Sequence, residues 1–271
     1  MRPTLRAVCG ASIVALSFVA LWRCASQTRI APEVRAQIEK RHAGNVVELR
    51  QSNYYGQLYD ENELWLLSPH PFADTSHIVD LNGAPIHPKG QKGIVPAGSR
   101  FVIERIEFPD RSALTHRMLT TPRYNPWVYL KPAPDETHAP LENRRGFVAL
   151  LPLELETEQQ VEDAIAAMFA PEGDVQRWLG SRRPTVRAAI EHKNVVEGMS
   201  REELTAAWGT PTMWFIEQSP KGEARVAWYT SKEVWLVNDT VAEVKDGRAV
   251  QQAPRENVSS EGTPTTPPPQ S

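Results

Sequence analysis

The sequence has few cysteines, no excess of positive charge and no long apolar run. Its 271 residues include only Cys9 and Cys24, so no intrachain disulfide can form beyond residue 24. Thirty Lys and Arg residues against 33 Asp and Glu give a net charge of −3, which supplies no basic surface for nucleic acid. The uncharged run at 7–22 is slightly shorter than the ~17–25 residues that usually span a bilayer. These absences exclude a disulfide-rich scaffold and a nucleic-acid-binding protein, while 41% hydrophobic residues exclude global disorder.

The signatures of common catalytic sites are also missing. No Gly-x-Ser-x-Gly elbow, phosphate-binding loop or dinucleotide fingerprint occurs in the chain. No cysteine beyond Cys24 is available as a nucleophile. We therefore expect a protein that needs no cofactor and acts by binding rather than by catalysis.

One histidine-containing loop is the candidate for a metal site. His70, Asp74 and His77 are residue types that ligate zinc, and a loop can bring three such ligands together. However, Pro69 and Pro71 flank the first histidine, and no helical two-histidine motif or second acidic cluster accompanies it. The three side chains are therefore predicted to be polar loop residues that bind no metal, with a metal-assisted hydrolase as the alternative.

Residues 1–23 have the pattern of an export signal. Arg2 and Arg6 form a basic start, and the uncharged run at 7–22 follows. Removal of residues 1–23 takes away three arginines and no acidic residue, so the net charge changes from −3 to −6. A negative surface does not bind anionic lipid by charge, so any attachment to a membrane must come from the N-terminus.

Cys24 lies just beyond the apolar run, three residues after Leu21, and this arrangement resembles the lipoprotein box of bacterial lipoproteins. The resemblance implies that Cys24 is acylated and becomes the mature N-terminus. Trp22 and Arg23 stand where such boxes have small residues, so an uncleaved anchor and ordinary cleavage near Ser26 stay open. Each outcome places the chain on the periplasmic or cell-surface side of a bacterial membrane.

Changes in composition divide the chain after residue 23 into five segments. The first is a tether, and its apolar residues at every fourth position also allow a helix. The last is rich in Pro, Thr and Ser and is predicted to be a disordered tail. In order, the segments are a tether over 24–44, a β-rich region over 45–152, a helical connector over 153–183, a mixed domain over 184–250 and the tail over 251–271.

The β-rich region consists of short β-type runs broken by Pro, Gly, Asn and Asp. The turn and run at 95–103 resemble those of bacterial SH3-like domains, which implies a small all-β barrel. Such a barrel would also allow an alternative function as a cell-wall or glycan-binding module. The predicted runs are 46–49, 63–67, 77–81, 100–108, 127–130 and 146–151.

Two capping-box patterns mark helix starts further along the chain. Thr157 with Gln160 predicts a helix in the connector, and Ser200 with Glu203 predicts one in the C-terminal domain. Gly209 then supplies a C-terminal cap for the second helix. Turn residues separate the runs that follow, so an antiparallel meander is expected. These runs are 213–217, 224–230, 233–237 and 240–245.

This succession of helices and meander over residues 184–247 resembles the SmpA/OmlA (BamE-like) family of outer-membrane lipoproteins. The resemblance implies two helices packed on an antiparallel sheet and a non-catalytic role as an assembly or scaffold subunit. It also implies that the matching residues, with Glu203 of the capping box, shape the fold and take no part in chemistry. The matching residues are Gly198, Met199, Ser200, Gly209 and Pro211.

Aromatic side chains are the remaining candidates for partner binding. Trp and Tyr dominate binding hot spots where they are exposed and contribute to the core where they are buried. Arg123 and Tyr124 precede Trp127 in a loop and are candidate ligand contacts. The other candidates, on the predicted C-terminal strands, are Trp214, Trp228 and Trp235.

Together these patterns predict an α+β protein. Its N-terminal part is an all-β small barrel of SH3-like type, and its C-terminal part is an ααβββ(β) domain with an antiparallel meander. The predicted function is that of an exported, lipid-anchored envelope scaffold, whose partner is an envelope protein or a cell-wall component.

Overall fold

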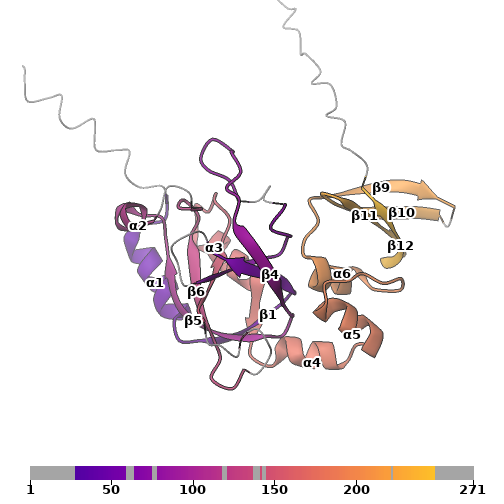
Figure 1. Ribbon diagram of the computed structural model, residues 1–271, viewed down its shortest axis with the longest axis horizontal. Coiled ribbons are helices and arrows are strands. Elements are labelled where there is room, and N and C mark those ends of the chain that lie inside the picture. The colour runs from indigo at the N-terminus through magenta and orange to yellow at the C-terminus, as the bar shows by residue number, and fades with distance from the viewer. Residues whose placement is uncertain are drawn as a thin grey trace, which may run out of the picture.

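The computed structural model describes residues 28–58, 64–74, 78–117, 121–136, 141, 145–220 and 222–247 (Figure 1). Strands dominate these residues, which form a mixed α+β structure with an eight-stranded sheet and a four-stranded sheet. Figure 1 shows the smaller sheet beside the larger one, with α1 (Pro32–His42) at the opposite side of the molecule. Cys24, His77, the predicted export signal and the predicted tail lie outside the described residues.

The larger sheet has the strand order β4-β2-β3-β7-β6-β5-β1-β8. Its pairings are antiparallel apart from the parallel pair formed by β3 and β7. A short helix, α2 (Arg111–His116), connects β5 to the loop before β6. The strands are β1 Val46–Leu49, β2 Asn53–Gln57, β3 Trp65–Ser68, β4 Lys89–Val95, β5 Arg100–Glu107, β6 Trp127–Pro132, β7 Phe147–Leu150 and β8 Phe169–Pro171.

Apolar side chains of the central strands build the main core. In β5, Phe101, Ile103 and Ile106 are buried, and Phe101 packs edge-on against Phe147 of β7 with ring centroids 5.3 Å apart. β6 is buried on both faces over its first four residues, as expected for a strand in the interior of a sheet. Burial at these positions therefore holds the middle of the sheet together.

Helix α1 closes this core on the side of β5. Pro32 occupies its first turn, where the missing N–H costs nothing, and Ile38 is fully buried in the main core. Arg41 forms an ion pair of 2.7 Å with Glu158 of α3 (Glu158–Met168). The helix that the spacing allowed within 24–44 is therefore present, and it is packed on the larger sheet because its narrow apolar stripe meets strands that lie later in the chain.

The connector contributes to the sheet as well as linking it to the C-terminal domain. Its predicted capping box is present, since Thr157 Oγ1 accepts from the Gln160 N–H at 3.2 Å and Gln160 Oε1 accepts from the Thr157 N–H at 3.1 Å. β8 follows α3 directly and pairs with β1. The Glu48 carboxylate of β1 accepts the Val175 N–H at the start of α4 (Asp174–Gly180) at 2.7 Å. The predicted helical segment therefore also supplies an edge strand.

Three strands of the larger sheet, β2, β4 and the short β8, were not predicted, and one predicted run is absent in its described part. β2 contains an asparagine and a glycine, and β4 contains two glycines and two lysines. These residue types are uncommon in strands, so they weaken the β-type pattern of both segments. The expected run at 77–81 forms, over its described residues, only an isolated bridge between Val79 and Pro85. Pairing with neighbours thus overrides local composition at three places.

The C-terminal domain begins with two helices, and the predicted antiparallel meander follows them. Ser200 Oγ accepts from the Glu203 N–H at 3.2 Å, and Glu203 Oε2 accepts from the Ser200 N–H at 2.7 Å, so the second capping box is present. Gly209 ends the second helix with φ at +84°, a conformation that favours glycine. The sheet order is β12-β11-β10-β9. The elements are α5 Pro184–Glu191, α6 Arg201–Trp208, β9 Met213–Ser219, β10 Gly222–Tyr229, β11 Lys232–Val237 and β12 Thr240–Asp246.

The segment that leads into α6 also binds the start of β12. The Gly198 N–H donates to the Val241 carbonyl at 2.8 Å, and the Val241 N–H donates to the Met199 carbonyl at 2.7 Å. Met199 is fully buried among the side chains of α5, α6 and the sheet. These contacts give Gly198 and Met199 a structural role.

Ser52, between β1 and β2, connects the two parts of the molecule. Its N–H donates to the Ala206 carbonyl of α6 at 2.9 Å, and its hydroxyl donates to the Ile190 carbonyl of α5 at 2.6 Å. The same hydroxyl accepts from the Ala97 N–H at 2.9 Å. Buried hydrogen bonds from one residue therefore fix both C-terminal helices against the larger sheet.

Candidate functional site

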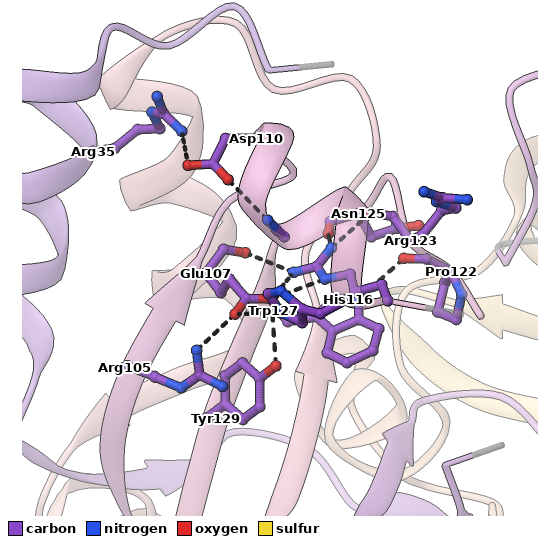
Figure 2. Close-up of polar contacts among 12 residues, drawn as sticks. Arg35, Arg105, Glu107, Asp110, His116, Pro122, Arg123, Asn125, Trp127 and Tyr129 are labelled. Atoms are coloured by element: carbon purple, nitrogen blue, oxygen red, sulfur yellow. Dashed lines mark hydrogen bonds and ion pairs between the residues drawn. The ribbon is translucent and has the colours of Figure 1, made fainter. Parts of the chain in front are cut away.

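The predicted loop candidates near residue 123 belong to a packed polar network (Figure 2). Trp127 is buried, its indole N–H donates to the Pro122 carbonyl at 3.0 Å, and the Arg117 guanidinium lies 4.2 Å from its ring centroid. Arg123 donates to the Leu114 carbonyl at the end of α2. Trp127 is therefore a core residue that fixes the loop, and it offers no surface to a ligand.

Glu107 lies at the centre of this network, and Figure 2 shows Arg105 and Tyr129 directed toward it. The buried Arg117 donates to Glu107 Oε1 at 2.9 Å and also to the Asn125 carbonyl at 2.7 Å, while Arg105 donates to Glu107 Oε2 at 2.6 Å. Burial alone would raise the pKa of Glu107, but the charges and hydrogen bonds of the two arginines lower it below its usual value. A carboxylate held ionised by two cations is suited to structural anchoring rather than to proton transfer.

His70 and Asp74, two of the three weak metal candidates, line a cavity between the two parts of the molecule. Burial lowers the pKa of His70, and the nearby Asp74 opposes that shift. Among the residues that the structure describes, no three His, Cys, Asp or Glu side chains form a group that could hold a metal ion.

Exposed apolar side chains gather on the C-terminal sheet. Trp214 and Ile216 of β9 are 37% and 64% exposed, and Met213 of the same strand is also exposed, whereas the exposed Val244 lies on β12 at the opposite edge of the sheet. By contrast, the predicted candidate Trp235 is 8% exposed, lies under the Lys245 ammonium at 3.7 Å, and packs on Ala224 and Val226. Trp228 is half-buried. Of the predicted tryptophans, Trp214 is therefore the one placed to meet a partner.

Three of the four sheet edges in the described part of the chain carry features that discourage pairing with another strand. Charged residues, irregular pairing and short length all protect an edge. β12 has Glu243, Lys245 and Asp246 and a register shift against β11. β4 has Lys89 and Lys92 and two register shifts against β2, and β8 is three residues long.

Strand β9 differs from these three edges. It is seven residues long and pairs with β10 without a register shift, and Glu217 is its one charged residue. Among the described strands, β10 is its only partner. An edge of this length with exposed apolar side chains is a candidate surface for binding an extended strand of another chain.

The sequence reasoning identified Trp214 and the strand that contains it, but it missed the exposure of Ile216. The order of the meander could have indicated that β9 is an edge strand, because the first strand of a meander has only one neighbouring strand in that meander. The sequence alone does not show which of the two edge strands is covered. That depends on the hydrogen bonds of Gly198 and Met199 with β12, which join residues about forty positions apart.

The chain matches no protein-family model, no curated protein and no solved structure. Within the described residues, none of the helices has the length and apolar character needed to cross a bilayer.

Proposed function

We propose that this chain is an exported, membrane-tethered bacterial envelope protein that acts as a non-catalytic scaffold and docks a protein partner along β9. The observation that carries the proposal is the exposure of Trp214 and Ile216 on a seven-residue strand at the edge of its sheet. The partner contributes an extended segment with apolar residues at alternate positions. Main-chain hydrogen bonds set its register, and its side chains cover those of β9.

The magnitude of this contact suits a specific but reversible interaction. Full burial of an aromatic or branched aliphatic side chain contributes ~1.5–3 kcal/mol, so covering Trp214 and Ile216 offsets a substantial part of the cost of association. Main-chain hydrogen bonds to β9 add specificity for an extended backbone. Glu217 is the single charge on the strand, so a partner strand of either net charge sign meets little repulsion.

Resemblances support the location and the architecture in this proposal. The lipoprotein box at Cys24 supports a lipid anchor. The likeness over 184–247, where α5 and α6 precede an antiparallel meander, supports an ααβββ(β) domain of SmpA/OmlA type and a scaffold role. The turn at 95–99, which leads into β5, supports an SH3-like relationship for residues 45–152.

The docking proposal is tested with tagged full-length protein captured from detergent-solubilised envelopes. Ile216→Asp places a charge on the β9 edge, whereas Leu81→Asp places one on another exposed apolar residue, 51% exposed, in the connection between β3 and β4. We expect Ile216→Asp to weaken capture of the partner at least about tenfold, or ~1.4 kcal/mol, and Leu81→Asp to leave it unchanged. Equal capture by both variants, or recovery of cell wall without a protein partner, would contradict the proposal.

The anchor is tested separately by Cys24→Ser. If Cys24 carries the acyl chains, this substitution moves the protein from the membrane fraction to the aqueous fraction. Unchanged partition between the two fractions would rule out an acyl anchor. It would not bear on the proposed interaction at β9.

A further inference from the structure

Lys193 is a buried cation at the junction of the two parts of the molecule. It follows α5 with φ at +52°, and its residue is 5% exposed. Its ammonium donates to the Ser52 carbonyl at 2.7 Å and to the Ala207 carbonyl at 2.9 Å, and it lies 4.9 Å from the ring centroid of Tyr54. These contacts join α5, α6 and the segment before β2.

None of the contacts of this ammonium in the described part of the chain is with a carboxylate. Lysine is almost never fully buried unless it is paired, because desolvation of an ammonium costs several kcal/mol. Two carbonyl acceptors and an aromatic face offset part of that cost, but an ammonium has three donors and a full charge. The burial of Lys193 lowers its pKa to about 7, in accord with incomplete compensation.

Lys193 also lines a cavity of about 460 Å³, a size within the ~300–1,000 Å³ that is usual for small-ligand sites. The walls combine aromatic rings with hydroxyl groups and titratable groups from both parts of the molecule. Tyr229 is held by a hydrogen bond of 3.0 Å from its hydroxyl to the Gly209 carbonyl, so this wall is preorganised. The other lining residues used below are Tyr54, His70, Asp74, Trp208 and Lys232.

We propose that this cavity binds the carboxylate of a small ligand, with Lys193 as its counter-ion. The carboxylate supplies the negative charge that the protein contacts of Lys193 lack, and the rings of Tyr54 and Trp208 contact the apolar or sugar-like body of the ligand. Asp74 opposes an anion, which limits affinity, while the Lys232 ammonium on the cavity wall is already paired with Asp246 at 2.6 Å. The site is independent of β9.

The pH dependence of this binding separates Lys193 from its neighbours. Burial lowers the pKa of His70 and raises the pKa of Tyr54 and of Tyr229, so these three groups stay neutral between pH 7 and 9. In the same interval Lys193 loses its proton in the free protein. Binding of a carboxylate should therefore take up a proton, and affinity should fall toward tenfold for each pH unit above 7.

Isothermal titration calorimetry of the full-length protein tests the proposal with three probes. N-acetylphenylalanine represents a peptide carboxyl terminus, glucuronate represents an acidic sugar, and N-acetylphenylalanine amide is the uncharged control. We expect one of the two acids to bind with proton uptake at pH 8 and the amide to bind at least about tenfold more weakly. The acid that binds identifies the source of the carboxylate.

Two substitutions assign the effect to the cavity. Lys193→Met should abolish binding of the acid, and Asp74→Asn, which removes an opposing charge from the wall, should strengthen it about two- to fivefold. Because Lys193→Met also leaves two buried carbonyls without a donor, Asp74→Asn keeps the test decisive if that variant does not fold. Failure of both acids to bind at about 10 mM, or equal binding of acid and amide, would overturn the proposal. Neither result bears on capture through β9.

Discussion

The two edges of the C-terminal sheet differ in how they are built. β12 is fastened at its start to the segment before α6 by hydrogen bonds through Val241, and further along it carries the charged residues Glu243, Lys245 and Asp246. β9 has no covering segment among the described residues, carries only one charged residue, Glu217, and presents Trp214 and Ile216. The comparison teaches that one edge of this sheet is tied into the fold, whereas the other is the edge that we propose for recognition. Substitutions in β12 should therefore mainly lower the stability of the fold, whereas substitutions in β9 should mainly weaken binding of the partner.

The largest expected effect is on the β12 side. Val241 is 1% exposed and packs in the core formed with α5 and α6, so Val241→Asp buries a charge without a partner. We expect the free energy of unfolding to fall by more than about 4 kcal/mol, measured by urea denaturation. A loss below about 1 kcal/mol would break the comparison, because β12 would then be as tolerant as β9.

A second effect concerns the helices that cover the β12 half of the sheet, which Lys193 joins to Ser52. The pKa of Lys193 is about 7 in the folded protein and 10.5 in its ordinary state, so the unfolded chain binds more protons between these values. The free energy of unfolding should therefore rise with pH from about 7 to 10, by up to about 1.4 kcal/mol per pH unit. Denaturation at several pH values checks this, with Lys193→Met as the control that should lose the slope. A slope that persists in this variant would point to another group.

A smaller effect is expected at the cap of α6. Ser200→Ala removes the hydroxyl that accepts the Glu203 N–H and should lower stability by about 1 kcal/mol. Ser200→Thr retains a hydroxyl and should cost much less. Thermal unfolding of the two variants sharpens the comparison, since the capped helix start lies beside β12. Equal midpoints for both variants would show that the cap contributes nothing there.

The smallest effect on stability is expected at β9. Ile216→Asp changes a side chain that is 64% exposed, so the free energy of unfolding should change by no more than about 0.5 kcal/mol. The same substitution is expected to have the largest effect on partner capture. A loss of stability comparable to that of Val241→Asp would mean that β9 is part of the folding core, and the two edges would then be equivalent.

Local signals in the sequence predicted much of this fold. The hydrogen bonds of both capping boxes join residues three positions apart, and both are present. The meander was predicted from runs and turns that are also local. The fold is α+β, as expected, with a large open sheet in its N-terminal part.

Features that depend on distant contacts were not predictable in this way. β2 contains Gly56, where a Cβ atom would lie 2.5 Å from the Gly90 carbonyl oxygen of β4, so its composition reflects close strand approach rather than β propensity. Ile38 gains its role from strands formed later in the chain. The environment of Lys193 is made by Ser52, 141 positions earlier, and no pattern near Lys193 indicates it.

The placement of α1 has a mechanical consequence for a tethered protein. The described chain begins beside α1, and α1 is bound to β5 and α3 rather than free to swing. Figure 1 shows β9 at the other side of the molecule from α1. An anchor at the N-terminus would therefore hold the molecule on the side of α1 and present the proposed docking strand on the opposite side. The larger sheet lies between them and would set the distance of β9 from the membrane.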